Sequence, residues 1–174
     1  MKSVIRYFIL FVVLSAIVFT LNMTTRAQDK SKPEILAQAT AAKIVPSSFY
    51  FAGQSAPTQM RNSAVARIGK DRYVIAGLVD TSGYSTEISG KYEGFFITDS
   101  PITIGGKTLE SGAYGFGFSA DNKLRIFDLS SKEIMTVETV SDKEMKRPRP
   151  LMMSAAGDGV RFYKGKSYAL VTAN

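Results

Sequence analysis

Short runs of β-branched and aromatic residues recur along the chain from Phe49 onward, and Gly, Asp, Asn and Ser residues separate them. Runs of this kind at short, regular spacing are typical of the strands of a sandwich or barrel. They predict one all-β domain over residues 47–174, built as an antiparallel β-sandwich or flattened barrel. The strands that we expect span residues 48–51, 64–68, 72–79, 94–98, 102–104, 113–119, 124–129, 134–139, 160–164 and 167–172.

Turn-forming residues stand between several of these runs, and two longer segments, residues 80–93 and 141–156, interrupt the rhythm. Long excursions in a compact domain frequently carry function. Tight turns are predicted at Gly69-Lys70-Asp71, Gly105-Gly106, Asp121-Asn122 and Gly165-Lys166.

The segment GAYGFGFS, residues 112–119, places aromatic side chains on one face of a strand and almost nothing on the other. Because side chains alternate across a strand, Gly115 and Gly117 leave a gap on the second face, which we call the glycine trough. Either a bulky residue of this chain fills the trough or a flat ligand ring enters it. We favour filling by the chain, since an uncovered glycine strand is entropically costly. The candidate fillers are Tyr73, Phe95, Phe162 and Tyr168.

The first 27 residues have the layout of a secretory signal peptide. Lys2 and Arg6 precede an apolar run over residues 7–21, and Thr25-Arg26-Ala27 supplies small residues at the positions that a signal peptidase reads. We expect cleavage after Ala27, export to the periplasm or the exterior, and only transient membrane contact. An uncleaved anchor is the alternative, but the run is shorter than the roughly 20 residues that span a bilayer core.

Residues 28–46 are polar and alanine-rich, and they predict a short helix or a loose arm before the β domain. Pro33 and Glu34 suit the start of a helix. The apolar positions that follow at helical spacing are Ile35, Leu36, Ala39 and Ala42.

The chain is mildly basic once the leader is removed. The leader holds three basic residues and no acidic one, so cleavage lowers the net charge from +7 to +4. This balance favours contact with an anionic envelope surface, and it does not indicate nucleic-acid binding in an exported protein. The chain contains no cysteine, so its core holds without disulfides.

The sequence also lacks histidine, and the two absences remove the usual general base, the thiolate nucleophile and the preferred ligands of zinc, copper and iron. Glu87 and Glu93 are the carboxylate pair that we consider for a glycosidase, and Asp80 and Asp121 offer oxygens to calcium. Solvated loop charges and turn formation are the simpler interpretations. We therefore predict a protein without catalytic residues, metal or cofactor.

Three segments are candidate binding sites. Tyr84, Ser85 and Tyr92 offer flat rings and hydroxyls for a sugar or a peptide, with packing at the rim of the core as the alternative. A second segment offers amide and guanidinium groups for hydrogen bonds, with satisfaction of backbone groups as its alternative, and consists of Gln59, Arg61 and Asn62.

The third candidate is the segment KEMKRPRP, residues 143–150, which we call the basic loop. Proline keeps a chain extended, so the cations are expected to project as a hydrated ribbon that suits an anionic lipid or polysaccharide. An exposed linker without a specific partner is the alternative. The cations are Lys143, Lys146, Arg147 and Arg149.

Residues 101–119 contain the pattern I-x-I-G-G-K-x-L-x-x-G-x-Y, at Ile102, Ile104, Gly105, Gly106, Lys107, Leu109, Gly112 and Tyr114. This hairpin resembles one found in exported β domains of environmental bacteria whose function is unknown. The resemblance implies export and a β fold, and it brings no catalytic residue to this chain.

The function predicted from these features is that of a non-enzymatic exported module that binds a saccharide, a peptide or an envelope component. The alternative is a structural envelope protein that assembles with copies of itself, or docks, through its arm and basic loop. A third hypothesis is an enzyme that works with carboxylates, tyrosine or lysine alone.

Overall fold

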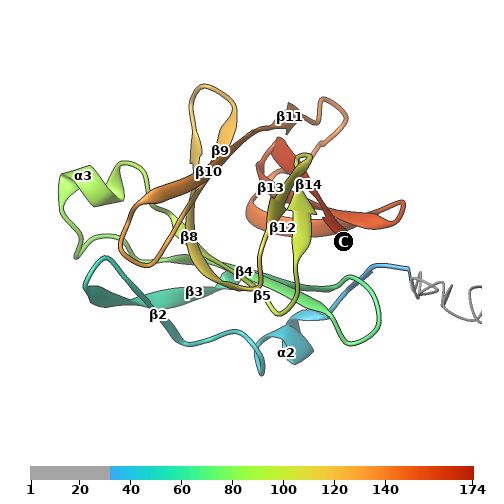
Figure 1. The fold of residues 1–174 in the computed structure, drawn as a ribbon, viewed down its shortest axis with the longest axis horizontal. Coiled ribbons are helices and arrows are strands. Elements are labelled where there is room, and N and C mark those ends of the chain that lie inside the picture. Colours follow the sequence, from blue (N-terminus) through green and yellow to red (C-terminus); the bar gives the residue numbers. More distant parts are fainter. Residues whose placement is uncertain (1–31) are drawn as a thin grey trace, which may run out of the picture.

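The structure is a computed structural model that describes residues 32–174. It consists of two antiparallel sheets with two one-turn helices (Figure 1). The predicted signal peptide and the start of the predicted arm lie outside the described residues. The elements in chain order are β1 Glu34–Ile35, α2 Gln38–Ala41, β2 Ser48–Phe51, β3 Gln54–Arg67, β4 Tyr73–Val79, α3 Thr86–Ser89, β5 Gly94–Thr98, β6 Ile102–Ile104, β7 Lys107–Leu109, β8 Gly112–Ser119, β9 Lys123–Phe127, β10 Glu133–Glu138, β11 Val140–Ser141, β12 Arg149–Ala156, β13 Gly159–Gly165 and β14 Ser167–Ala173.

The first sheet has eight strands in the order β1-β3-β4-β5-β8-β9-β10, with β2 beside β3. The second sheet has six strands in the order β12-β13-β14-β6-β7, with β11 beside β14. The chain passes from the first sheet to the second between β5 and β6, returns between β7 and β8, and passes to the second sheet again where β10 runs into β11. These two antiparallel sheets agree with the predicted sandwich.

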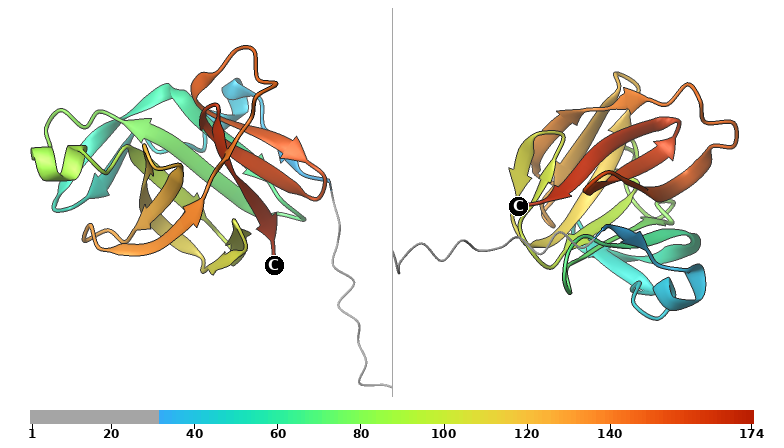
Figure 2. Two further views of the ribbon diagram at one scale, coloured as in Figure 1. Left: turned by 90° about the horizontal axis from the view of Figure 1, so that it is seen from above. Right: turned by 90° about the vertical axis from the view of Figure 1, so that its right-hand side faces the viewer.

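Apolar side chains gather in two clusters, one on each face of the first sheet. The inner cluster lies between the sheets, where Phe96 and Phe116 of the first sheet meet Phe162 of the second. The cover cluster lies on the opposite face, beneath α2, β2 and the segment between β4 and β5. In the right-hand view of Figure 2, the second sheet and the N-terminal segment lie on opposite sides of the molecule. The first sheet is therefore a buried middle layer.

Most predicted strands form with ends within two residues of those expected, and the four predicted turns form as well. The structure differs from these expectations at four strands. Strand β3 begins at Gln54 rather than Ala64, β7 and β11 were not foreseen, and half of the excursion over residues 141–156 is the regular strand β12.

The arm prediction also needs correction, because residues 34–46 are part of the folded domain. Glu34 and Ile35 form β1 beside β3, and the helix α2 begins only at Gln38. Ala41 and Val45 are buried in the cover cluster. The segment is neither a helix from Pro33 nor a loose arm.

The glycine trough is filled by the chain itself, as predicted, but not by any of the four predicted side chains. A methyl group at Gly115 would stand 2.8 Å from Cδ2 of Phe51, whose ring occupies the trough. A methyl group at Gly117 would overlap the carbonyl oxygen of Lys91 and stand 2.9 Å from its carbonyl carbon. The trough thus receives one ring from β2 and the backbone of the segment before β5.

We expect Gly117→Ala to lower the free energy of unfolding by about 2–3 kcal/mol, because the added methyl meets backbone that cannot turn aside. Gly83→Ala is the matched control, since no atom lies within 4 Å of its added methyl. Its unfolding free energy should stay within about 0.5 kcal/mol of the parent protein. Urea denaturation measures both, and equal values for the two variants would contradict the close contact at Gly117.

Candidate functional site

The predicted tyrosine site is part of the core. Tyr84 and Tyr92 are 8% and 0% exposed. The ring of Tyr92 stacks on Phe51 with centroids 3.8 Å apart, and Tyr84 meets Tyr92 edge to face at 5.4 Å. Both rings pack in the cover cluster. The packing alternative therefore applies, and the expected contact of these rings with a ligand is corrected.

The polar atoms of this segment are largely used within the fold. The hydroxyl of Ser85 caps α3 by accepting a hydrogen bond from the backbone of Ile88, and that of Tyr84 donates to the carbonyl of Gln54 at 3.2 Å. The buried hydroxyl of Tyr92 has no hydrogen-bond partner among the described residues. Burial, followed by the neighbouring hydroxyl of Tyr84, raises the pKa of Tyr92 above its ordinary value.

The segment with Gln59, Arg61 and Asn62 is a wide bulge in β3, because pairing with β4 shifts between Thr58 and Ser63. The amide of Gln59 donates to the carbonyl of Val79 at 3.0 Å and accepts from Asn62 at 2.8 Å. Gln59 thus satisfies a backbone carbonyl of β4 beside the bulge, and Asn62 holds the amide of Gln59 in place, which agrees with the alternative we kept for this segment. Arg61 is exposed.

The basic loop is exposed, but it is not one extended ribbon. Lys143 lies in a turn, Lys146 and Arg147 lie in a bend, and Arg149 opens β12 opposite Gly165. All four cations are exposed to solvent. Both ends of the loop lie beside the β13–β14 turn, since the backbone of Asp142 donates to the carbonyl of Lys166 and Arg149 pairs with Gly165.

The two carboxylates considered for catalysis have separate partners. Glu87 lies 3.8 Å from the ammonium of Lys91. Glu93 pairs with Lys164 of β13 and accepts a hydrogen bond from the backbone of Phe118 at 2.9 Å. Burial lowers the pKa of Lys164. Glu93 therefore links the two sheets and does not face Glu87 across a cleft.

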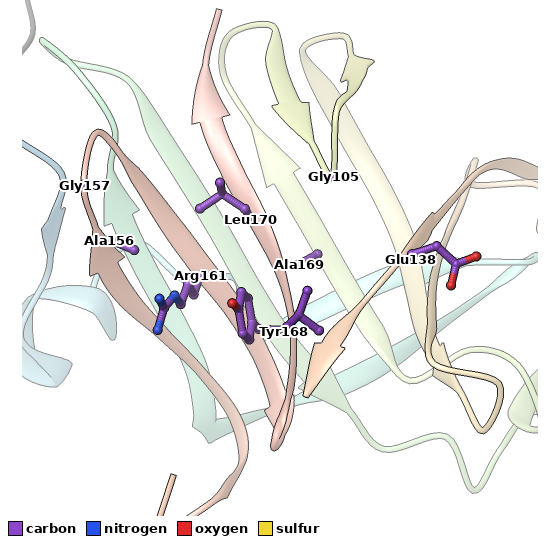
Figure 3. Close-up of a pocket in the computed structure, with 9 residues that line it drawn as sticks. Gly105, Glu138, Ala156, Gly157, Arg161, Tyr168, Ala169 and Leu170 are labelled. Atoms are coloured by element: carbon purple, nitrogen blue, oxygen red, sulfur yellow. The ribbon is translucent and has the colours of Figure 1, made fainter. Parts of the chain in front are cut away.

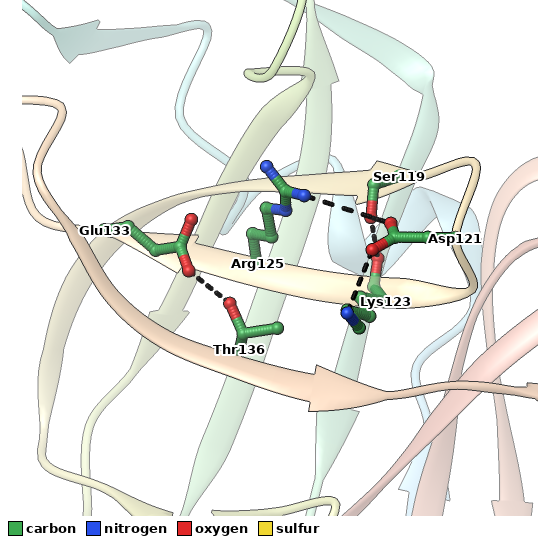
Figure 4. A network of polar contacts seen from close by, with 6 residues as sticks. All are labelled: Ser119, Asp121, Lys123, Arg125, Glu133 and Thr136. Carbon is green, nitrogen blue, oxygen red and sulfur yellow. Dashed lines mark hydrogen bonds and ion pairs between the residues drawn. The ribbon is translucent and has the colours of Figure 1, made fainter.

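The acidic turns considered for calcium are likewise internally satisfied. Asp121 accepts from Ser119, pairs with Lys123 at 3.0 Å and lies 3.9 Å from Arg125 (Figure 4). The hydrogen bonds from Ser119 and then Lys123 lower the pKa of Asp121 to about 2. Asp80 accepts from the backbone of Ser82 at 3.0 Å. Turn formation accounts for both carboxylates.

The outer face of the second sheet carries a different set of side chains. Tyr163 pairs with Tyr168, Tyr168 pairs with Val140, and Arg161 pairs with Leu170 across the strands. Residues paired across a sheet share a face, so these five side chains lie on the outer face, where Tyr163 is covered and the other four line the surface. Val140 and Leu170 are 56% and 43% exposed, which makes the surface partly apolar.

Arg161 is held in place on this surface. Its guanidinium lies 4.9 Å from the ring centroid of Tyr168, diagonally across the hairpin. Nη1 lies 3.4 Å from the hydroxyl of Tyr163 and 3.8 Å from Oδ2 of Asp142. The hydroxyl of Tyr163 donates to that same carboxylate oxygen at 2.8 Å. Asp142, the residue before the basic loop, thereby holds Tyr163 by a hydrogen bond and lies within ion-pair distance of Arg161.

A pocket of about 490 Å³ opens beside this guanidinium. Strand β14 pairs with β11 at Tyr168 and with β6 from Val171 onward, so Ala169 and Leu170 face a gap between two short strands. The gap is spanned by one bond, from the backbone of Gly105 to the carbonyl of Leu170 at 2.9 Å. Figure 3 shows Arg161, Tyr168 and Leu170 on one side of the pocket and Glu138 on the other.

The sequence analysis did not identify this pocket, although the positions of its hairpin residues could be predicted from the sequence. The predicted strands over 160–164 and 167–172, with their Gly165-Lys166 turn, fix which residues of the hairpin lie opposite each other. The alternation of Arg161, Tyr168 and Leu170 with buried neighbours then places them on the outer face. The contact of Asp142 and the gap beside β14 depend on the strand order and carry no local pattern.

We expect Tyr92→Phe to leave the free energy of unfolding unchanged or higher, because the hydroxyl it removes is buried without a partner. Tyr92→Ala should lower it by about 3–5 kcal/mol by removing the ring beneath Phe51. Tyr84→Phe is the matched control and should lose about 1 kcal/mol with its hydrogen bond. Thermal and urea denaturation measure all three, and an equal loss in the Phe and Ala variants of Tyr92 would contradict the packing role.

Comparisons with known proteins leave the site to be judged on its geometry. No protein-family model, no curated protein and no solved structure matches the chain. Within residues 32–174, no helix has the length and apolar character needed to cross a membrane, and no group of acidic side chains is arranged to hold a metal ion.

Proposed function

We propose that the protein is a non-enzymatic exported module that binds a ligand or a cell-envelope partner through the outer face of its second sheet. The observation that supports this best is the pocket beside β14, where a fixed guanidinium stands next to exposed apolar side chains. Concave sites with an apolar lining and a few convergent polar groups are typical of ligand binding. In this proposal the ligand contacts Arg161, Tyr168 and Leu170 instead of Tyr84 and Tyr92.

The non-enzymatic part of the proposal rests on the lack of histidine and cysteine and on the separate pairing of Glu87 and Glu93. Export rests on the leader pattern over residues 1–27 and on the resemblance of the hairpin over residues 102–114.

The alternative, a structural protein that assembles or docks through its arm and basic loop, has less support. Residues 34–46 pack onto the first sheet, where Ala41 and Val45 are buried, so they are used within the domain. The basic loop remains as the contact for such a role. Like-charged loops on two copies would repel each other, which favours a different, anionic partner.

Native mass spectrometry of the protein purified from the envelope of its own host tests the proposal. We expect a discrete small increment over the mass of the chain, from a bound molecule. Leu170→Ser should lose the increment because it removes apolar surface from the pocket. The matched control is Ile134→Ser, which changes an equally exposed apolar side chain, 45% against 43%, on β10.

A bare chain mass for the folded parent protein would contradict the proposal, and an increment that survives Leu170→Ser would place the site elsewhere. A multiple of the chain mass would favour the structural alternative. The denatured mass of the same sample shows whether the chain begins at Gln28.

A further inference from the structure

We infer that the pocket binds an apolar carboxylate, a molecule in which one carboxylate is attached to a compact hydrocarbon or aromatic group. This inference rests on the proposed function and names the class of ligand for the same site. The carboxylate binds Arg161, and the apolar group lies on Val140, Tyr168 and Leu170. The end of a peptide with a large apolar last residue and a free aryl or alkyl acid share this chemistry.

The guanidinium of Arg161 is prepared for a carboxylate. Among the described residues, the contacts of the guanidinium are made by its Nη1 atom and by its face on the ring of Tyr168, so the other N–H groups of the planar fork remain for a ligand. Arginine presents donors in a geometry that matches the two oxygens of a carboxylate. The stacking on Tyr168 fixes the group beforehand, which reduces the entropy lost when a ligand binds.

Asp142 does not neutralise this guanidinium fully. Its Oδ2 lies 3.8 Å from Nη1, beyond hydrogen-bond distance, and the same oxygen already accepts the 2.8 Å hydrogen bond of Tyr163. The side chain of Arg161 remains 42% exposed. A ligand carboxylate therefore adds hydrogen bonds that the protein does not make, without displacing Asp142.

The rest of the lining selects an apolar group. Val140 and Leu170 are the exposed apolar side chains of the surface, and Ala156 and the two glycines of the lining add no hydrogen-bonding side chain. A saccharide would leave most of its hydroxyl groups facing hydrocarbon, which is costly for groups that lose water. Burial of a hydrocarbon or aromatic group on these side chains is favourable.

The charges around the pocket favour a single anionic group. Glu138 lies on the side opposite Arg161 in Figure 3, so a second negative charge on the ligand would be repelled there. The exposed cations of the basic loop, which starts beside Asp142, raise the local concentration of anions and steer them to this face.

Titration of the folded protein with 3-phenylpropionate and with its uncharged analogue 3-phenylpropanamide tests the inference. Nitrogen-15 NMR spectra report both affinity and place. We expect the carboxylate to shift the amide signals of Val140, Tyr168 and Leu170 and to bind at least ten-fold more tightly than the amide. Arg161→Gln should abolish that difference, and Arg161→Lys, which keeps the charge but loses the fork, should reduce it.

Two controls separate charge from fold. Arg61→Gln removes an exposed arginine of the first sheet and should leave the ten-fold preference intact. Leu170→Ser should weaken both compounds by a similar factor, because it removes only apolar contact. N-acetyl-phenylalanine, which mimics the end of a peptide, then distinguishes a peptide from a free acid as the source of the ligand. Tighter binding of this compound than of 3-phenylpropionate assigns the ligand to a peptide.

Equal affinity for the acid and the amide, or a preference that survives Arg161→Gln, would overturn the inference. Failure of the acid to bind, while the host-derived mass increment is present and is lost in Leu170→Ser, would overturn the ligand class and leave the proposed function standing. Binding to phosphatidylglycerol vesicles that survives Arg161→Gln but is lost when Lys146 and Arg147 become glutamine would also overturn it, in favour of a lipid surface.

Discussion

The packing of Phe51 and the Lys91 backbone against the glycine trough of β8 is the contact on which the arrangement of the whole molecule depends. Any side chain at Gly115 or Gly117 would hold the cover away from the first sheet. Because Gly115 and Gly117 place no side chain of β8 in the trough, β2 and the segment before β5 come close enough to bury the second face of that sheet. The sheet becomes a middle layer with apolar side chains on both faces.

This burial decides where a ligand can bind. The tyrosines between β4 and β5 are buried in the cover cluster, where Tyr92 stacks on Phe51. Their rings therefore do not lie on the surface of the first sheet. The second sheet has a core on its inner face, and its outer face carries Arg161, Tyr168 and Leu170. A pocket opens on that face at one edge of β14, because β11 and β6 each pair with only part of this edge and leave a gap between them.

The sequence pattern predicted the strands well where alternation and turn residues agree, as in the β13–β14 hairpin. It predicted that the chain fills the glycine trough, but it named the wrong side chains, because Phe51 reaches Gly115 through a strand order that no local pattern encodes. Strand β12 was missed since two prolines precede its methionine-rich run and prolines oppose a strand assignment. The start of β3 was missed because polar residues fill its bulge, where Gln59 bonds the carbonyl of Val79 and the alternation of a regular strand is lost.

The candidate site divides in the same way. Alternation along β13 and β14 is enough to place Arg161 and Leu170 on an exposed face. The hydrogen bond from Tyr163 to Asp142 joins residues 21 positions apart, and it depends on the path of the basic loop. A site built from such contacts becomes visible only when the sheet order is known.

A double-mutant cycle between Gly115 and Phe51, measured by urea denaturation, tests the packing at the trough most directly. We expect Gly115→Ala to cost about 2–3 kcal/mol in the parent protein, because the methyl meets the phenyl ring. In a Phe51→Ala background the same change should cost far less, since the ring is gone, and the coupling energy should exceed about 1 kcal/mol. Additive effects of the two substitutions would show that Phe51 does not occupy the trough, and the burial of the tyrosines beneath the cover would lose its cause.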